Sequence, residues 1–337
     1  MKKFILSIIY IAFNTINAYS CTTFVLKSQN ELIFGRNLDW YSDNGIVVIN
    51  KRNVLKNSLV FSPDKPIQWT SKYGSISFNQ FGKEFPFGGI NEKGLIIEIM
   101  VAPAEYPLKD ERPAVNELQW VQYQLDNSQS IDDVVNSDKL LRISAISQEL
   151  HFLICDKNGN TAVIEFKNNK MLVYRDYELP IPVLENEVYS NSLENYNNNI
   201  SCRFTTVANM IKNYYPQKDN SIVDYSFQIL DSVALSGSWS IVYDVKNMKI
   251  HFKTQTNHHI QIIDFTKFNF DCKSENLIYN LSENYEGIID NFFISLNSKV
   301  NKDILQKAIK SNKLDLAKEV KSRFFKYYQE CKCENIK

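Results

Sequence analysis

Short runs of alternating apolar and polar residues, separated by Gly, Asn, Asp and Pro, dominate the chain from residue 21 to residue 103. CTTFVLKS at 21–28, ELIFGRNLDW at 31–40 and GLIIEIMVAP at 94–103 are typical of them. Runs rich in Val, Ile, Phe and Thr with a period of two predict β-strands. Because turn residues follow each run closely, we expect these strands to pair as antiparallel hairpins.

Helical and strand-like segments then alternate in groups. Residues 114–136 have a helical period, with Leu118, Val121 and Leu125 on one face. A second group of strand-like runs follows, in which the Asn158-Gly159 pair predicts a tight hairpin turn. Groups of strands interrupted by helices, rather than strict alternation, predict an α+β layered fold with largely antiparallel sheets.

The last part of the chain repeats this mixture. Residues 203–214 are helical in pattern, and residues 239–254 predict a hairpin that turns at 245–249. From about Asn276 the composition becomes rich in Lys and Glu with helical spacing. We therefore expect a main domain over residues 21–275 and a C-terminal helical extension over residues 276–337.

The N-terminus has the features of a signal peptide. Lys2 and Lys3 precede an apolar block at 4–13, and the small residues Ala18 and Ser20 stand before Cys21. The apolar block is shorter than the roughly 20 residues that a transmembrane helix needs. We expect residues 1–20 to be removed and the chain to be exported, to the periplasm or the medium, with no integral membrane span.

Charge and cysteine content limit the partners. The 38 basic residues balance the 38 acidic residues, so no basic field favours nucleic acid. Six cysteines in an exported chain could form disulfides, although the sequence fixes no pairing. Cys155 has the setting of a free buried thiol, and Cys331 with Cys333 is a weak zinc motif because no paired C-x-x-C supports it.

Cys21 is a candidate nucleophile. A nucleophilic cysteine needs a base, which is most often histidine, but no histidine here lies in a Cys–His protease context. Cleavage before Cys21 would create another base on the same residue, because an α-amino group has a pKa of about 7.7 to 8.0. Cys21 would then carry both the nucleophile and its base.

The following hairpin would return charged residues to Cys21. If residues 28–31 form its turn, Cys21 lies opposite Leu38, and Arg36 and Asp39 lie within a residue or two of the new N-terminus. Arg36 would favour the thiolate, and Asp39 would accept hydrogen bonds from the α-ammonium or the thiol. The alternative is an ordinary ion pair of Arg36 and Asp39 at the end of a strand.

The same residues resemble the N-terminus of the choloylglycine hydrolase family, which are linear-amide C–N hydrolases of the N-terminal-nucleophile superfamily. The resemblance consists of a Cys-Thr start at a processing point and a later Gly-Arg-Asn-x-Asp, here residues 35–39. GGINEKGL at 88–95, VYSNS at 188–192 and SCRF at 201–204 extend it, so that it spans residues 21 to about 266. It implies a four-layer αββα sandwich of antiparallel sheets.

The resemblance also implies roles for three further residues. Asn91 would give its backbone N–H, and Asn191 its side-chain amide, to the oxyanion of the tetrahedral intermediate, while Arg203 would reach the site from the start of a helix. Each residue has a structural alternative. Asn91 could open a type I turn closed by Gly94, Asn191 could be one more loop asparagine, and Arg203 could be a solvated arginine at a helix start.

The function implied is amidohydrolysis through an acyl-thioester on Cys21, with no metal or cofactor. The substrate would be a small-molecule N-acyl amide, such as a bile acid amide, penicillin V or another acyl amide. The resemblance leaves a homo-oligomer open, but only eleven residues separate Asn191 from Arg203, where many bile acid hydrolases have a long insertion associated with tetramers. Several aromatic residues could line an apolar acyl pocket or belong to the core, namely Trp40, Tyr41, Trp69, Phe85 and Phe87.

A second hypothesis comes from another class of protein. A signal segment followed directly by Cys is what an acylated lipoprotein needs, so the chain could be a binding module anchored through Cys21. Ala18 stands where lipid-modification signals usually have Leu, and Thr22 to Phe24 enter a predicted strand instead of a flexible tether. Both features favour the amidase.

Overall fold

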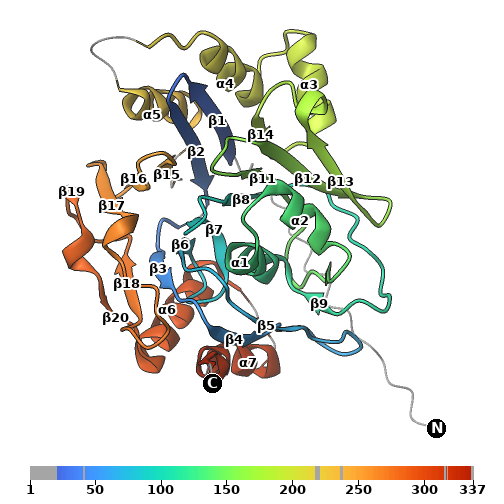
Figure 1. Ribbon diagram of the computed structural model, residues 1–337, viewed down its shortest axis with the longest axis vertical. Coiled ribbons are helices and arrows are strands. Elements are labelled where there is room, and N and C mark those ends of the chain that lie inside the picture. The colour runs from blue at the N-terminus through green and yellow to red at the C-terminus, as the bar shows by residue number, and fades with distance from the viewer. Residues whose placement is uncertain are drawn as a thin grey trace.

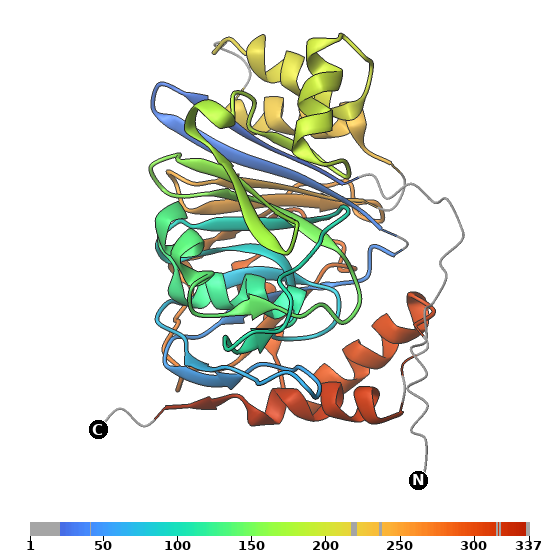
Figure 2. The ribbon, with the colours of Figure 1, turned by 90° about the vertical axis from the view of Figure 1, so that its right-hand side faces the viewer.

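The structure is a computed structural model that describes residues 21–40, 42–216, 221–235, 238–314, 316 and 318–334. The expected signal peptide at 1–20 therefore lies outside the described residues. Two large antiparallel sheets pack face to face, and helices cover the outer faces (Figures 1 and 2). This is the expected α+β sandwich of αββα type.

The first sheet contains β1, the strand that directly follows Cys21. Within the described residues it has seven strands in the order β14-β1-β2-β15-β16-β17-β19, and only the pairing of β17 with β19 is parallel. The expected hairpin is confirmed, because Ser28 pairs with Glu31 and Thr22 with Asn37. Its strands are β1 (Thr22–Ser28), β2 (Glu31–Asp39), β14 (Val183–Glu185), β15 (Ser238–Asp244), β16 (Lys249–Thr254), β17 (Gln261–Asp264) and β19 (Gly287–Ile288).

The second sheet is antiparallel throughout. In the part of the chain that the structure describes, its nine strands follow the order β13-β12-β11-β8-β7-β6-β3-β18-β20. Asn158 and Gly159 lie in the turn between β11 and β12, as expected. The strands are β3 (Ile46–Asn50), β6 (Ser75–Asn79), β7 (Pro86–Asn91), β8 (Ile96–Val101), β11 (Leu150–Cys155), β12 (Thr161–Lys167), β13 (Lys170–Arg175), β18 (Leu277–Asn280) and β20 (Ile294–Ser295).

Smaller elements complete the sandwich. Helices α4 and α5 pack on the first sheet, and α1 packs on β7 and β8 of the second sheet. The helices are α1 (Glu117–Asn127), α2 (Ile131–Ser137), α3 (Tyr189–Asn197), α4 (Arg203–Lys212), α5 (Ile222–Val233), α6 (Ser298–Ser311) and α7 (Lys318–Glu330), with 3-10 turns at Asp176–Glu178, Phe265–Lys267 and Asp290–Phe292. The short strands are β4 (Val54–Asn57), β5 (Gln68–Thr70), β9 (Ala114–Val115), β10 (Arg142–Ile143) and β21 (Lys332–Cys333).

Local sequence signals fix the starts of several helices. The side chain of Asn116 accepts hydrogen bonds from the N–H groups of Leu118 and Gln119 and caps α1. The thiol of Cys202 caps α4 by accepting from the N–H of Thr205 at 3.5 Å. Such caps satisfy backbone donors that the first turn of a helix leaves without partners. Cys202 thus places Arg203 at the first position of α4.

The C-terminal helices begin later than expected. Residues 276–297 were expected to be helical, but β18 pairs with β3 at Ile278 and Val48, and β20 extends the same sheet. Ile278 and Tyr279 are buried because they add to the sheet edge. The helices from Ser298 onward make up most of the segment and determine its composition. The composition therefore gave no sign of the short strands before Ser298.

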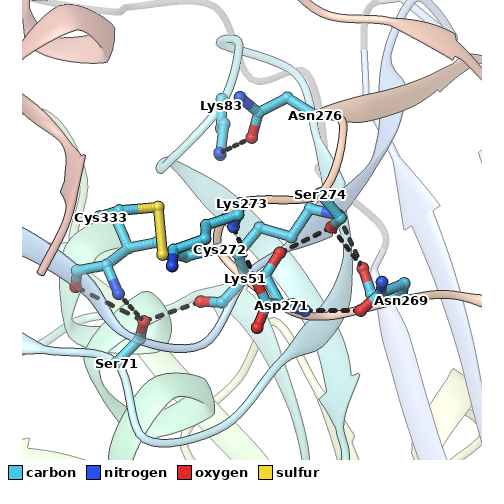
Figure 3. The surroundings of a disulfide bond; sticks show 11 residues. Lys51, Ser71, Lys83, Asn269, Asp271, Cys272, Lys273, Ser274, Asn276 and Cys333 are labelled. Atoms are coloured by element: carbon cyan, nitrogen blue, oxygen red, sulfur yellow. Dashed lines mark hydrogen bonds between the residues drawn. A yellow bond between two sulfur atoms is a disulfide. The ribbon is translucent and has the colours of Figure 1, made fainter. Parts of the chain in front are cut away.

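The C-terminal segment is attached to the sandwich by a disulfide. Cys333, in β21, is bonded to Cys272, and β21 pairs with β4 (Figure 3). Cys333 therefore serves in a disulfide and not in a zinc site, while Cys155 is a buried free thiol as expected. No helix among the described residues is long and apolar enough to cross a membrane.

Candidate active site

Cys21 directly precedes β1, and the neighbouring strand β2 brings Arg36 and Asp39 beside it. The β1–β2 register pairs Thr22 with Asn37, so Cys21 extends this ladder to face Leu38, as the hairpin predicted. Arg36 and Asp39 are buried, with 1% and 4% of their surfaces exposed. They are not an exposed pair at a strand end, which was the alternative for them.

The thiol of Cys21 is buried among charged groups. Burial raises the pKa of the Cys21 thiol, while the guanidinium of Arg36, a hydrogen bond from the backbone of Asp39 and the more distant charge of Arg203 act to lower it. The thiol in turn acts to raise the pKa of the Arg36 guanidinium. These neighbours stabilise the thiolate, and burial opposes them.

Arg36 is held from behind by a buried carboxylate. Its Nη1 pairs with the carboxylate of Glu98 on β8 and donates to the carbonyl of Phe87 at 3.2 Å. The hydroxyl of Tyr243 donates to the other oxygen of Glu98 at 2.5 Å. Burial lowers the pKa of Arg36, and the negative groups around it oppose this shift. The guanidinium is therefore fixed in orientation beside Cys21.

Gly88 makes room for this arrangement. A Cβ built on Gly88 would lie 1.9 Å from Oε2 of Glu98, far inside contact distance. Glu98 itself was not identified from the sequence. The signal that could have found it is a single acidic residue inside the apolar run of β8, because a buried carboxylate requires a cationic or hydrogen-bonding partner.

Asp39 closes the site at the end of β2. Its Oδ1 accepts a hydrogen bond from the backbone N–H of Leu235 at 3.1 Å. Burial raises the pKa of Asp39 to about 7, against the lowering effects of that hydrogen bond and of Arg203 and Arg36. Asp39 can thus exchange a proton near neutral pH.

Arg203 reaches the same point from the first turn of α4. Its Nη1 donates to the backbone carbonyl of Cys21 at 3.1 Å, and its Nε lies 3.6 Å from the carboxylate of Glu185. Glu185 lies opposite Thr22 in the pairing of β1 with β14. Arg203 therefore contacts Cys21 directly and is not a purely solvated side chain.

Asn91 is a turn residue in this structure. Its backbone N–H donates to the carbonyl of Leu95 at 3.0 Å, and its carbonyl accepts from Gly94 at 2.8 Å. Its side-chain amide donates to the carbonyls of Leu125 and Ser128 at the end of α1. Every one of these contacts serves the turn and the packing of α1, so the structure does not offer the N–H of Asn91 to an oxyanion.

Asn191 is also placed away from Cys21. It is exposed on α3, and its side-chain amide donates to Glu187 at 2.9 Å. The asparagine that strand pairing sets beside Cys21 is Asn186. Since Thr22 pairs with Glu185, the β1–β14 register sets Asn186 opposite Cys21, and its Nδ2 donates to the carbonyl of Val101 at 2.8 Å. The Asn-rich sequence offers several candidates, and only strand pairing distinguishes them.

A large apolar cavity opens at Cys21. Its volume is about 1050 Å³, part of which is open to solvent. Of the aromatic residues considered from the sequence, Trp40, Phe85 and Phe87 line it, Trp69 does not, and Tyr41 lies outside the described residues. Beside Cys21 itself the wall consists of Arg36, Leu38, Ile99, Met100 and Val101. Such a cavity suits an apolar acyl group bound next to the thiol.

The positions of the histidines and of possible metal ligands bear on which chemistry the cavity could support. None of the four histidines lines it, and His151 is instead buried with its Nδ1 3.2 Å from Glu165. Across the described ranges, no group of three or more His, Cys, Asp or Glu residues is arranged to hold a metal ion. Cys21 and Arg36 line the cavity, and Asp39 lies between two further lining residues, Leu38 and Trp40.

The chain was compared with known proteins. A family model described as linear amide C–N hydrolases, choloylglycine hydrolase family, matches residues 21–214. Penicillin V acylase of Pectobacterium atrosepticum is 23% identical over 324 residues, which cover 79% of this chain and 86% of that protein.

Solved structures are similar in fold. A penicillin V acylase from Agrobacterium tumefaciens has a TM-score of 0.70 at 20% identity, over 82% of this chain and 98% of that one. A mutant of the conjugated bile acid hydrolase from Clostridium perfringens has a TM-score of 0.64 at 21% identity, over 82% of this chain and 99% of that one. The family match covers more than half of the chain and includes Cys21, Arg36, Asp39 and Arg203. The chain therefore belongs to the choloylglycine hydrolase family of linear amide C–N hydrolases.

Proposed function

We propose that this chain is an exported amidohydrolase that cleaves small-molecule N-acyl amides through an acyl-thioester on Cys21, once residues 1–20 have been removed. One observation carries the proposal: Cys21 lines an apolar cavity together with Arg36, whose positive charge acts to lower the pKa of the thiol. A positioned thiol beside a fixed cation and below an acyl-sized cavity is suited to nucleophilic attack on an amide carbonyl.

The reaction begins with proton transfer on Cys21. Its α-amino group, freed by cleavage of the Ser20–Cys21 bond, takes the thiol proton as the sulfur attacks the carbonyl carbon. The same proton then passes to the leaving amine, which departs and leaves the acyl-thioester. Water attacks the thioester, the amino group accepts a proton from that water, and release of the carboxylic acid regenerates the thiol.

Neighbouring groups hold these atoms in place. Arg36 stabilises the thiolate, and Asp39 accepts a hydrogen bond from the α-ammonium that forms during attack. Arg203 fixes the backbone of Cys21 through the bond to its carbonyl oxygen. Each of these groups is attached to a strand or helix end, so little reorganisation is required during the reaction.

Asn186 is the proposed side-chain donor to the oxyanion, in place of Asn191. The strand register sets it opposite Cys21, and its amide already points toward the cavity wall at Val101. Removal of one such donor typically raises the barrier by about 2.7 to 4 kcal/mol. Asn186→Ala should therefore lower kcat by about 100-fold to 1000-fold, whereas Asn191→Ala should have little effect because that side chain is exposed.

Export is part of the proposal. The signal-like features at residues 1–20 motivate it, and the disulfide between Cys272 and Cys333 is a bond that persists in oxidising compartments. Detection of the processed chain in the periplasm or medium, with Cys21 at its N-terminus, would support export. Recovery of the full-length chain only from the cytoplasm would contradict it.

The test of the function is hydrolysis of an amide panel by the processed protein. Hydrolysis of bile acid amides, penicillin V, acyl-homoserine lactones and fatty amides should be measured for the wild type and for the variants Cys21→Ala and Cys155→Ala. Cys155 is the matched control, because it is also a buried free thiol but lies in β11 away from the cavity. We expect only Cys21→Ala to abolish hydrolysis. A diacylglycerol adduct on Cys21 in the purified protein would instead indicate the lipoprotein.

A further inference from the structure

The C-terminal helices form one wall of the cavity that contains Cys21. Leu305 and Ile309 line it from α6, and Val320 and Phe324 line it from α7. In each helix the two residues are four positions apart, so they lie on one face, and that face is turned to the cavity. Both helices lie outside residues 21–214, to which the family model extends. The wall is therefore built from residues that the family model does not cover.

Aromatic side chains form the surface that faces these helices. Phe81, Phe85 and Phe87 line the cavity between the helices and the strands that carry Cys21. The rings of Phe85 and Phe324 are 4.9 Å apart, so α7 packs directly on this surface. Figure 2 shows α6 along the side of the sandwich at which β1 begins and β2 ends. The helices thus extend the cavity away from the nucleophile.

Two polar residues of the cavity wall are hydrogen-bonded to other parts of the protein. Glu117 accepts hydrogen bonds from the N–H groups of Ile146, Ser147 and Gln148. The amide of Asn116 donates to the carbonyl of Leu59. Away from Cys21 and Arg36, the wall therefore provides mainly hydrocarbon surface. Such a surface recognises an acyl group by burying it and not by pairing with hydroxyl or charged substituents.

The helix pair is firmly attached to the rest of the protein. Asn301 of α6 accepts a hydrogen bond from the N–H of Lys83 at 3.0 Å. In α7, Arg323 donates to the carbonyl of Val60 at 3.0 Å, and Tyr327 donates to the carbonyl of Asn57 at 2.5 Å. The indole of Trp40, next to Asp39, donates to Asn312 at the end of α6. The wall is thus fixed relative to the nucleophile.

We propose that the α6–α7 wall determines acyl specificity and that the preferred substrates are amides of long, unsubstituted aliphatic acids, whose distal carbons contact Leu305, Ile309, Val320 and Phe324. This inference rests on the proposed function, because it needs the acyl carbonyl at Cys21. Each methylene buried against the wall should raise kcat/KM by up to about fourfold. The rise should stop when the chain has filled the cavity.

The experiment measures kcat/KM for a series of amides that share one amine and carry linear acyl groups from butanoyl to tetradecanoyl. Penicillin V and a conjugated bile acid are included for comparison. For the wild type we expect kcat/KM to rise with the length of the acyl chain. For the best aliphatic amide, kcat/KM should be at least tenfold higher than for either comparison substrate. A higher kcat/KM for either comparison substrate, or no dependence on chain length, would overturn the inference.

Two variants change the wall in opposite directions. Val320→Trp should fill the cavity and shift the optimum to shorter chains, with hydrolysis of the shortest substrate retained. Ile309→Ala should open the cavity and shift the optimum to longer chains. Glu319→Trp is the matched control, since it adds the same side chain to an exposed position of α7. If both wall variants are folded, as judged by thermal unfolding, and keep the wild-type dependence on chain length, then α6 and α7 do not determine acyl specificity.

The outcome also separates this inference from the proposed function. If wild type hydrolyses no member of the series and no comparison substrate, the proposed function fails. If wild type hydrolyses several members through Cys21 but the wall variants keep the wild-type profile, only the role of α6 and α7 is lost.

Discussion

Glu98 pairs with Arg36 directly behind Cys21, in a position where neither side chain reaches solvent. The exposed fractions are 0% for Glu98 and 1% for Arg36, and Tyr243 completes the arrangement by donating to Glu98. A buried guanidinium needs a buried partner, because an unpaired charge in the interior is strongly destabilising. The carboxylate thus keeps the guanidinium that faces Cys21 in one orientation.

Removal of the Glu98 carboxylate should destabilise the protein. Glu98→Ala leaves Arg36 charged and without its partner, and loss of one member of a buried pair costs about 3 to 5 kcal/mol. Urea unfolding of the variant should show this loss. Glu194→Ala, on the exposed surface of α3, is the control and should change the free energy of unfolding by less than about 0.5 kcal/mol. Equal stability of Glu98→Ala and wild type would contradict the account.

Gly88 and Glu98 should be energetically coupled. Gly88→Ala in the wild type would place a methyl group 1.9 Å from the Glu98 carboxylate and displace it from Arg36. In the Glu98→Ala background that clash is absent, so the same substitution should cost far less. A double-mutant cycle measured by urea unfolding tests this, and strict additivity of the two free-energy changes would show that the predicted clash does not matter.

Sequence patterns predicted the parts of this site that depend on local structure. The turn at 28–31 predicted the register that brings Arg36 and Asp39 to Cys21. The place of Arg203 was implied by the family resemblance, and the helical pattern at 203–214 agrees with the start of α4. These features depend on residues close together in the chain. Tight turns and helix caps have strong local signatures, so a single sequence was sufficient to find them.

Long-range pairing was beyond those patterns. Glu98 meets Arg36 because the two sheets pack face to face, and Asn186 faces Cys21 because β14 pairs with β1. No local signal specifies which strands become neighbours across many residues. For the same reason the strand at 277–280 was expected to be helical, since its partner β3 is far away in sequence.

The ionisation of Asp39 should make stability fall with rising pH in the unprocessed chain. Its pKa is about 7 in the folded state, against about 3.9 for an unfolded aspartate. The folded state therefore binds the extra proton between these values, and the associated stability is fully present below about pH 4 and lost as pH rises through 7. Asp39→Asn should remove this dependence.

The measurement is urea unfolding from pH 4 to pH 8.5 on the full-length chain. Asp231→Asn is the control, because Asp231 is half exposed and pairs with Lys253 at the surface. The same scan on the processed chain should show a smaller slope, since the new α-ammonium of Cys21 favours ionised Asp39. Identical pH profiles for wild type and Asp39→Asn would rule out a raised pKa.

The disulfide should stabilise the protein by constraining its unfolded chain. Cys272 and Cys333 are 61 residues apart in sequence, and closing a loop of this length contributes about 4 kcal/mol in the chain-entropy model. Reduction, or Cys272→Ser with Cys333→Ser, should lower the free energy of unfolding by an amount of this order. Cys331→Ser should remain sensitive to reductant, because Cys331 is a free thiol. A Tm that reductant does not change would contradict the disulfide.

If removal of residues 1–20 activates Cys21, only the processed chain should carry an acyl group during turnover, and the mass of the protein shows whether it does. Processed and unprocessed chains are mixed with a hydrolysable N-acyl amide, quenched with acid within the first turnovers and analysed by intact-mass and peptide mass spectrometry. We expect an adduct of the acyl mass on the thiol of Cys21 in the processed chain and none in the unprocessed chain. Hydrolysis and an adduct of equal extent in the unprocessed chain would contradict it.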